Sequence, residues 1–418
     1  MKNNILLIGS GGRESALLHA ILKSNLLNIC YFTPGVPQVH FHEKLQLCDI
    51  DISQNDAIIK FCKENNVNFV ICGPELPLCN GIIDELEKNG ISAYGPNKYA
   101  SQLEGSKIFM KDVLQKAGIP TARYQTFTDR EFIQALEFLK SFTEKVVIKT
   151  DGLAAGKGVY ICESFIESSQ VLQEFFAGKF GNAGKSVVIE EFLEGREVSV
   201  FALCDGKNAI PFYHACDYKK IGEGDTGLNT GGMGSFAPSF LTNDQFNEIV
   251  NKYFNATLKE LQNRSIVYKG FLFGGLIITK NGPKFLEYNI RMGDPETQSI
   301  MPLLDCDFLE ILLKSYRGEL TQSDIKFTKN HAVTVVLASG GYPLEFQKHK
   351  EIVGLDSASC FIFSSGLYKK DDKFFTDGGR VISVTATAKN QTEARNEAYK
   401  NVQKIIFDNI YYRKDIAK

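Results

Sequence analysis

The first hundred residues alternate between short apolar runs and segments of helical spacing, and this alternation constrains the fold more than any other feature. Ile5–Ile8, Ile29–Phe32 and Phe69–Cys72 are apolar runs of strand length. Residues 13–23 and 57–64 carry apolar side chains at helical spacing. Strands that alternate with helices form a parallel sheet with helices on both faces. We therefore expect an α/β fold that begins with a parallel αβα domain.

Glycine-rich loops follow the first and third apolar runs, at the strand ends where parallel sheets bind ligands. The loop Gly9–Glu14 opens a helix, and free N–H groups at a helix start favour an anion. It lacks the third glycine, and the second run lacks the acid that would hold the ribose of a dinucleotide. We expect a single phosphate there, with a glycine turn that only reverses the chain as the alternative. The second loop is Gly73-Pro74-Glu75.

The pattern changes near residue 105. Apolar runs at 146–149, 158–162 and 187–192 predict a β-rich region, and 271–279 with 284–289 predict a hairpin. The glycine-rich stretch 211–238 is expected to be loop. A last segment begins near residue 332.

A further glycine-rich segment, residues 151–158, follows Lys149 between two expected strands. It is not a Walker loop, because only three residues separate Gly152 from Gly156 and Gly158 replaces the Ser or Thr. A strand–loop–strand of this composition can cover phosphates with its backbone N–H groups. The alternative is a flexible hairpin beside a lysine whose head reaches solvent.

Carboxylates surround the end of the apolar run at 187–189. A purine needs a backbone donor and acceptor and an acceptor for its amino group, and a ribose needs a carboxylate. Glu190, the backbone of residues 191–193 and Glu197 can supply these groups. A solvated acidic turn explains the same pattern equally well.

Glu287 and Asn289 lie two residues apart on an expected strand and so share one face. Two oxygen ligands on one face suit a hard cation such as Mg²⁺. Arg291 follows on that face and can reach a phosphoryl group. A surface strand with an ion pair is the alternative.

Charge, hydropathy and cysteine spacing exclude several classes of protein. The 418 residues hold 47 Lys plus Arg and 49 Asp plus Glu, a net charge of −2, which argues against a general nucleic-acid binder. No run approaches the roughly 20 apolar residues of a membrane helix. The ten cysteines form no Cys-x-x-Cys pair, which disfavours zinc and disulfide frameworks and indicates a reducing compartment.

Together these segments resemble the phosphoribosylamine–glycine ligase family, also called glycinamide ribonucleotide synthetases, of the ATP-grasp superfamily. The most specific match is Arg291–Gln298, and the match runs the whole chain. Ser15 and Tyr218 depart from the family pattern, which has His at both positions. The resemblance implies a parallel αβα domain at 1–104 and a two-lobed ATP-grasp module at 105–328, with a flap lobe at about 123–191. It also implies a small α+β domain at 329–418.

The resemblance implies that ATP, glycine and 5-phosphoribosylamine give glycinamide ribonucleotide, ADP and phosphate through glycyl phosphate, an early step of purine synthesis. The implied catalytic residues are Lys149 and Arg291. The implied ATP-binding residues are Lys107, Lys149, Gly156, Lys157, Gly158, Glu190, Glu191, Phe192, Leu193 and Glu197. The implied residues for glycine and phosphoribosylamine are Gly11, Gly12, Arg13, Glu14, Gly73, Pro74, Glu75, Asp217, Lys219, Asn229, Thr230, Gly231, Gly232 and Asp294. The implied ligands of Mg²⁺, or Mn²⁺ in its place, are Glu287 and Asn289.

We therefore expect a cytoplasmic, monomeric ligase of small molecules that binds neither nucleic acid nor membrane. Two rival functions remain. Another ATP-grasp ligase of purine synthesis would share the lysines and the flap but use a different acid. A non-catalytic nucleotide-binding or NAD-binding protein would not need the phosphate lysines and the metal ligands together.

Overall fold

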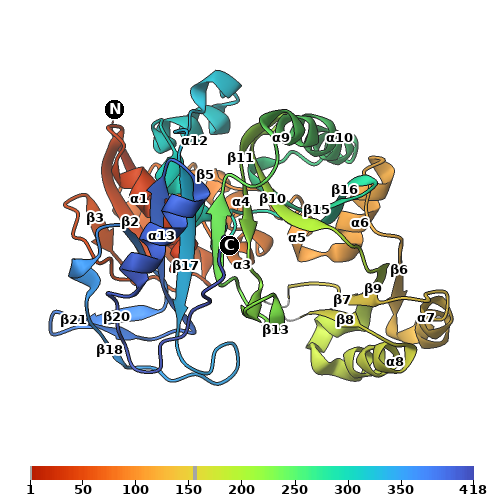
Figure 1. Cartoon of the computed structure of the whole chain (residues 1–418). Coiled ribbons are helices and arrows are strands. Elements are labelled where there is room, and N and C mark those ends of the chain that lie inside the picture. The colour runs from red at the N-terminus through yellow and green to blue at the C-terminus, as the bar shows by residue number, and fades with distance from the viewer. Residues whose placement is uncertain (1, 154–157) are drawn as a thin grey trace.

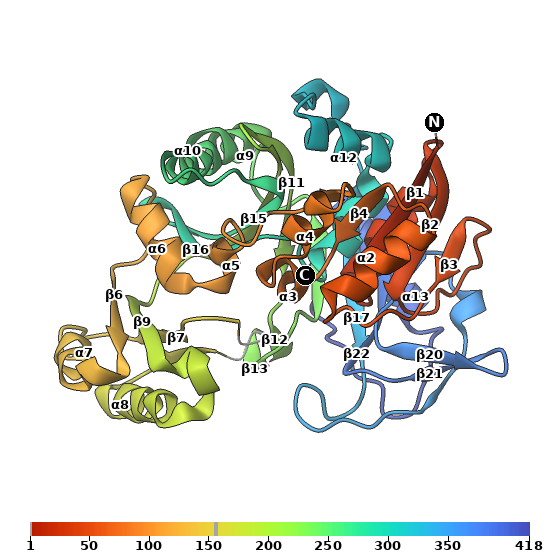
Figure 2. The same cartoon turned by 180° about the vertical axis from the view of Figure 1, so that it is seen from behind.

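The computed structural model describes residues 2–153 and 158–418 and begins with the predicted parallel sheet (Figure 1). Five parallel strands lie in the order β3-β2-β1-β4-β5. The helix α2 lies in front of this sheet in the reverse view (Figure 2). The strands are β1 Asn3–Gly9, β2 Leu27–Pro34, β3 Leu45–Leu47, β4 Phe69–Cys72 and β5 Ser92–Tyr94. The helices are α1 Gly12–Leu22, α2 Asn55–Glu64, α3 Glu75–Cys79 and α4 Ile82–Lys88.

A separate antiparallel sheet, in the order β6-β9-β7-β8, forms a lobe that we call the flap lobe, residues 124–191. It has a small hydrophobic core of its own, with Phe127, Ile148 and Phe175 at its centre. Its strands are β6 Tyr124–Thr128, β7 Val146–Thr150, β8 Val159–Cys162 and β9 Ser186–Glu191. The helices α7 Phe132–Leu139 and α8 Phe165–Glu174 lie at the outer end of the lobe (Figure 1).

The largest sheet has eight strands in the order β16-β15-β10-β11-β14-β17-β22-β19. It joins two parts of the chain, because β14 pairs antiparallel with β17. The sheet therefore continues through the boundary that we predicted near residue 328. Its strands are β10 Arg196–Asp205, β11 Ala209–Asp217, β14 Gly234–Ala237, β15 Lys269–Thr279, β16 Gly282–Asn289, β17 His331–Ala338, β19 Phe361–Ser364 and β22 Arg380–Ala388.

The prediction of a loop over residues 211–238 was wrong. This stretch contains most of β11, the whole of β14 and a two-stranded hairpin, β12 Lys220–Gly222 with β13 Thr226–Asn229. The glycine content concealed these strands. β11 pairs with β14 and β12 with β13 inside the stretch, whereas the outer partners β10 and β17 lie outside it.

The remaining elements complete the two larger domains. The helices are α5 Gln102–Gly105, α6 Lys107–Lys116, α9 Asn243–Ile249, α10 Asn255–Asn263, α11 Glu296–Ile300, α12 Phe308–Arg317 and α13 Gln391–Val402. The short strands β18 Glu351–Ile352, β20 Leu367–Lys370 and β21 Lys373–Thr376 form a third small sheet. Among the described residues, no helix has the length and apolar character that crossing a membrane requires.

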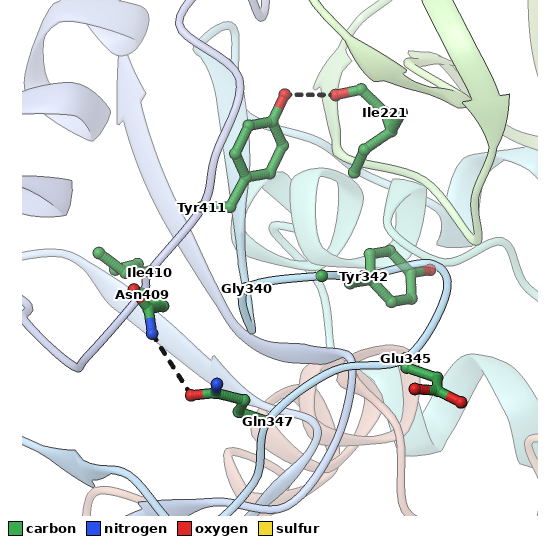
Figure 3. A pocket seen from close by; sticks show the side chains of 9 residues that line it. Ile221, Gly340, Tyr342, Glu345, Gln347, Asn409, Ile410 and Tyr411 are labelled. Atoms are coloured by element: carbon green, nitrogen blue, oxygen red, sulfur yellow. Dashed lines mark hydrogen bonds between the residues drawn. The ribbon is translucent and has the colours of Figure 1, made fainter.

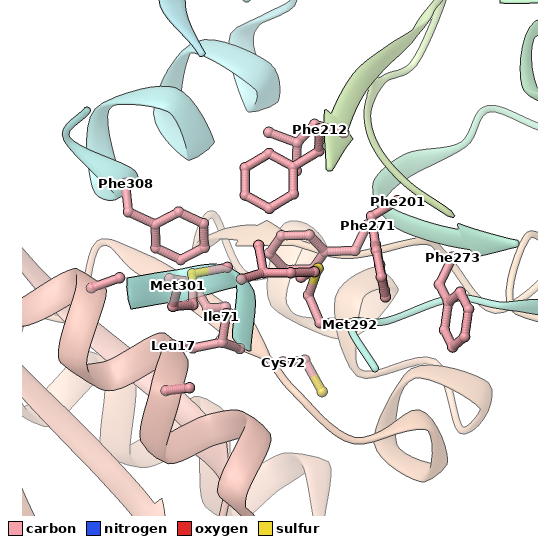
Figure 4. Packing of buried hydrophobic residues seen from close by; sticks show 14 of the residues in the cluster. Leu17, Ile71, Cys72, Phe201, Phe212, Phe271, Phe273, Met292, Met301 and Phe308 are labelled. Atoms are coloured by element: carbon pink, nitrogen blue, oxygen red, sulfur yellow. The ribbon is translucent and has the colours of Figure 1, made fainter. Parts of the chain in front are cut away.

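One continuous core joins the N-terminal sheet to the large sheet. Leu17 and Ile71 of the first domain lie close to Phe271 of β15 and to Met292, which follows β16 (Figure 4). Phe308 stacks on Phe271 with ring centroids 6.3 Å apart. This shared packing holds the loops of the two domains at one edge.

Candidate active site

The loop after β1 is organised around buried Glu14. The Gly11 N–H donates to Glu14 Oε2 at 2.8 Å, and Arg13 Nε pairs with Oε1 at 2.5 Å. A Cβ at Gly73 would collide with Glu14 Oε1, so the loop after β4 approaches closely because it has no side chain there. Although burial opposes it, the neighbouring carboxylates raise the pKa of Arg13. The two predicted loops therefore do lie together, with a fixed cation beside them.

Arg291 joins the N-terminal domain to the end of β16. Its Nε lies 3.3 Å from Glu75 Oε2, and its Nη2 lies 2.8 Å from Glu104 Oε1. Although burial opposes it, Arg291 lowers the pKa of Glu75, whereas burial raises the pKa of Glu104. The predicted cation is thus partly buried and already paired with two carboxylates. Glu104 was not among the predicted site residues.

Asp294 connects three parts of the molecule. Its Oδ2 accepts from the Arg13 N–H at 3.4 Å, and its Oδ1 accepts from Gln298 at 2.8 Å and from Arg380 Nη1 at 3.0 Å. Although burial opposes it, Arg380 and Arg13 lower the pKa of Asp294. The carboxylate is therefore held as an anion between the N-terminal and C-terminal domains.

Lys149 of β7 and Glu190 of β9 meet in a buried ion pair. Lys149 Nζ lies 3.1 Å from Glu190 Oε2 and also donates to the Leu286 carbonyl at 3.3 Å. Lys111 of α6, which is completely buried, lies 3.1 Å from Oε1 at an ion-pair distance but outside hydrogen-bond geometry. Although burial opposes it, the two lysines lower the pKa of Glu190. Burial lowers the pKa of Lys111 to about 8.

Lys111 is a residue that the sequence analysis missed. No local sequence feature distinguishes Lys111 from Lys116, which is exposed on the same helix. Burial of its whole side chain depends on how α6 packs against β9 and Thr121, whose hydroxyl accepts from Nζ at 2.6 Å. Glu190 was predicted to contact an adenine amino group. Its carboxylate faces two lysines and so fixes Lys149, and its contact with adenine stays a prediction.

The segment after β9 leaves one backbone donor available. The N–H groups of Glu191 and Phe192 donate to the carbonyls of Arg123 and Lys145. Among the described residues, the Leu193 N–H has no backbone partner. The Glu191 carboxylate pairs with Lys284 at 3.0 Å. An adenine ring at this segment would therefore be read by Leu193 and by carbonyl groups.

Lys107 is the first residue of α6 and lies beside the start of the glycine-rich segment, residues 151–158. Its Nζ donates to the Gly152 carbonyl at 3.1 Å, and burial lowers its pKa. Asp151 accepts from the Ser106 hydroxyl at 3.0 Å and holds this end of the segment against α6. Gly158 is described and buried. The predictions for Gly156 and Lys157 fall outside the described residues.

Glu287 and Asn289 share one face of β16, as predicted. Asn289 Nδ2 donates to Glu287 Oε1 at 3.3 Å. Gly275 lies opposite Glu287 in the register with β15, and a Cβ there would approach the Glu287 Cγ at 3.2 Å. Carboxylate and amide oxygens are the donors that Mg²⁺ prefers, so the pair fits this ion. Within 2–153 and 158–418, no group of three or more His, Cys, Asp or Glu side chains could hold a metal.

A cluster of charged side chains, Asp217, Lys219 and Glu197, lies at the end of β11. Lys219 Nζ lies 2.7 Å from Asp217 Oδ1 and 2.9 Å from Glu197 Oε2. Burial raises the pKa of Asp217. Burial and then Asp217 raise the pKa of Glu296 to about 7, while the Ser199 hydroxyl donates to it at 2.8 Å. These carboxylates therefore form a region where an added proton is favoured.

The glycine-rich loop 229–232 is held by the C-terminal domain. The Gly231 N–H donates to the Tyr342 hydroxyl at 3.0 Å, and its carbonyl accepts from Arg380 Nη1 at 2.7 Å. Gly232 has a φ of +112°, and a Cβ there would collide with Pro295. Arg380 and Tyr342 were not predicted as site residues, although both lie in segments that match the family pattern.

The predicted residues therefore form two adjoining groups along one edge. Around Asp294 and Arg291 lie the loops after β1 and β4 and the loop 229–232. Around Lys149 lie Lys107, the β9 segment and the β16 pair.

The comparisons agree across the whole chain. Residues 3–104, 105–297 and 332–418 match the N domain, the ATP-grasp (A) domain and the C domain of phosphoribosylglycinamide synthetase. A phosphoribosylamine–glycine ligase of Caldanaerobacter subterraneus subsp. tengcongensis is 44% identical over 99% of both chains.

Solved structures show the same architecture. The phosphoribosylamine–glycine ligase of Thermotoga maritima is 34% identical, with a TM-score of 0.86 over 99% of this chain and 100% of that one. The biotin carboxylase domain of the Hydrogenobacter thermophilus 2-oxoglutarate carboxylase, solved with MgADP and bicarbonate, has a TM-score of 0.74 at 16% identity. The match covers 98% of this chain and 92% of the biotin carboxylase chain. At this low identity it shows only that the two chains share a fold. The full-length match to all three domains shows that this chain belongs to the phosphoribosylglycinamide synthetase family.

Proposed function

We propose that this chain joins glycine to 5-phosphoribosylamine at the expense of ATP, giving glycinamide ribonucleotide, ADP and phosphate. Agreement with ligases of this name over 99% of both chains carries the proposal. The site supports it because its charged groups are cations and carboxylates in fixed positions. In phosphoryl transfer such positioning supplies most of the catalysis.

ATP would lie between the flap lobe and the large sheet. Leu193 and the neighbouring carbonyls would read the adenine, and Glu197 would accept from the ribose hydroxyls. Lys107 and Lys149 would contact the phosphates, since Lys107 donates to the Gly152 carbonyl and Lys149 lies on β7, which leads into the glycine-rich segment. Glu190 would hold Lys149 in place through their ion pair, and Lys111 would in turn hold Glu190.

Glu287 and Asn289 would hold Mg²⁺, or Mn²⁺ in its place. The ion would neutralise charge on the phosphate oxygens that complete its coordination. Lys149 donates to the carbonyl of Leu286, which immediately precedes Glu287, so the phosphate lysine and the metal pair share one support.

The first chemical step is attack of a glycine carboxylate oxygen on the γ-phosphorus. The P–O bond to ADP breaks and glycyl phosphate forms. Negative charge is redistributed over the γ-phosphoryl oxygens, and Arg291 and Lys149 would stabilise it electrostatically. Exclusion of water then protects the acyl phosphate from hydrolysis.

In the second step the amine nitrogen of phosphoribosylamine attacks the glycyl carbonyl carbon. Phosphate leaves, and the amine loses one proton. The phosphate of the ribosyl group would bind Arg13 and the N–H groups of the loop after β1. Asp217, with a raised pKa, and Asp294 lie along the edge where the new amide would form. Lys219 and the loop 229–232 would seat the substrates beside them.

The expectations of a monomer, of a cytoplasmic location and of no nucleic-acid partner belong to this proposal. So do the domain bounds 1–104, 105–328 and 329–418. The near-neutral charge supports small-molecule substrates.

Release of ADP tests the proposal. We expect the purified chain with Mg-ATP to release ADP only when glycine and phosphoribosylamine are both present, with glycinamide ribonucleotide detected by mass spectrometry. Turnover with bicarbonate or formate instead of glycine would overturn the substrate assignment. Lys149→Met should lose most turnover, whereas Lys179→Met, on the exposed side of the same lobe, should keep it.

A further inference from the structure

The β12–β13 hairpin, residues 220–229, has almost no core of its own. Residues 223–228 are all exposed, and Leu228 is 50% exposed. Its strands are joined by the pairs Lys220 with Asn229 and Gly222 with Thr226. A two-stranded hairpin without a buried face is marginally stable in water. Its position must therefore come from contacts with other parts of the chain.

The base of this hairpin carries two groups of proposed substrate residues. The Thr230 N–H and its hydroxyl both donate to the Lys219 carbonyl at 2.8 Å. The Met233 N–H donates to the Tyr218 carbonyl at 2.8 Å. Lys219 and the loop 229–232 therefore move as one unit with the hairpin. Displacing the hairpin would displace both.

A strap from the C-terminal end of the chain, residues 411–417, fixes the hairpin. Arg413 is completely buried and makes a bidentate pair with Asp415 at 2.8 and 2.7 Å. Its Nη1 donates to the Lys220 carbonyl at 3.0 Å and to Asp225 at 2.8 Å. Its guanidinium also lies 4.9 Å from the centre of the Tyr218 ring. One side chain thus contacts the first strand of the hairpin, its turn and its base.

Further contacts attach the strap to the hairpin and its base. The Tyr411 hydroxyl donates to the Ile221 carbonyl at 2.6 Å (Figure 3). Asp415 accepts from the Gly224 N–H at 2.8 Å at the hairpin tip. The Tyr218 hydroxyl accepts from the N–H of Ala417 at 2.9 Å.

The other side of the hairpin is poorly supported. A pocket of about 730 Å³ lies between Ile221, the loop Gly340–Gln347 and the segment Asn409–Tyr411 (Figure 3). Tyr342 on its rim reaches the Gly231 N–H. This space separates the hairpin from the loop Gly340–Gln347, so the strap holds the hairpin at residues 220–225, whereas Arg380 and Tyr342 hold Gly231 at its base.

We propose that residues 411–417 position the substrate loop, with Arg413 and Tyr411 as positioning residues. They lie in the C domain match, whereas the hairpin lies in the ATP-grasp match, so the strap couples the two domains at the acceptor side of the site. The inference rests on the proposed function, because that function assigns Lys219 and the loop 229–232 to substrate. Within 2–153 and 158–418, no hydrogen bond or ion pair joins the strap to a residue assigned to ATP.

Tyr411→Phe and Asp225→Asn test the proposal with little risk to folding, since each removes one contact and keeps the side-chain shape. Arg413→Lys removes the planar guanidinium that contacts Lys220, Asp225 and Asp415 together. Tyr412→Phe is the matched control, because no hydrogen bond from its hydroxyl is present among the described residues. Hydrogen exchange of residues 220–232 and the KM of each substrate are measured for all four variants of the full chain.

Exchange over residues 220–232 should quicken about fivefold in Tyr411→Phe, as expected for loss of one hydrogen bond, and more in Arg413→Lys. The KM of glycine or phosphoribosylamine should rise about as much, with the KM of ATP within about twofold of wild type. Unchanged exchange, faster exchange with unchanged substrate KM, or an equal rise in the KM of ATP would each overturn the inference. A wild-type chain that makes no product would instead refute the proposed function, and the exchange measurement would still decide whether the strap fixes the hairpin.

Discussion

Replacing Lys111 by Met tests the buried triad that supports Lys149. At 3.1 Å and an effective dielectric constant of about 20, the attraction between Lys111 and Glu190 is about 5 kcal/mol. Removing one partner of a buried pair costs about 3–5 kcal/mol. Lys149 remains on the other carboxylate oxygen at the same distance, so we expect the lower end, about 3 kcal/mol.

The loss should depend on pH. Lys111 helps to lower the pKa of Glu190, so its removal raises that pKa in the folded state. When a carboxyl group has a raised pKa in the folded state, the protein loses stability as pH rises through that pKa. We therefore expect Lys111→Met to become less stable, relative to wild type, as pH rises through the pKa of Glu190 in the variant.

Urea unfolding followed by far-ultraviolet circular dichroism measures the effect. Lys116→Met on the exposed face of the same helix is the control and should cost at most about 0.5 kcal/mol. Glu190→Gln alone should cost more than Lys111→Met, because it leaves two buried lysines without their shared carboxylate. The reasoning is refuted if Lys111→Met matches the control, or if Glu190→Gln costs less than Lys111→Met.

Three other changes probe the rest of the site. The pKa of Glu296 is raised to about 7, so its contribution to stability is full below about 4.5 and is lost as pH rises through about 7. Glu296→Gln should therefore raise the thermal midpoint relative to wild type at pH 8 but not at pH 4.5, and an equal shift at both would contradict this. Glu287→Gln should raise the Mg²⁺ concentration for half-maximal ADP release at least about tenfold, and an unchanged requirement would remove it from the metal site. Arg380→Gln breaks charge-assisted bonds to Gly231 and Asp294, so the KM of phosphoribosylamine should rise about tenfold or more while that of ATP stays constant; equal rises would refute this role.

Local sequence patterns predicted much of the fold. The apolar run Phe69–Cys72 is a strand with the same bounds in the structure, and the predicted hairpin across residues 280–283 is β15 with β16. Periodicity succeeds here because it records which face of an element is buried. It also placed Glu287 and Asn289 on one face, since side chains alternate along a strand.

Periodicity does not record which partner buries that face. Besides β11 nearby, the strand β14 pairs with β17, which lies far along the chain. The same pairing carries one sheet through the predicted boundary between the last two domains. No short-range pattern could have indicated it.

The sequence by itself determined the family, the alternating strands and helices of the first domain, and the kinds of charged group available to the site. The tertiary structure decided which charges meet. Lys111 and Lys116 look alike along the helix, yet only Lys111 is buried against Glu190. Arg380 and Arg413 act on a loop that precedes them by more than a hundred residues. Such contacts depend on how separate elements pack, and packing depends on the whole chain.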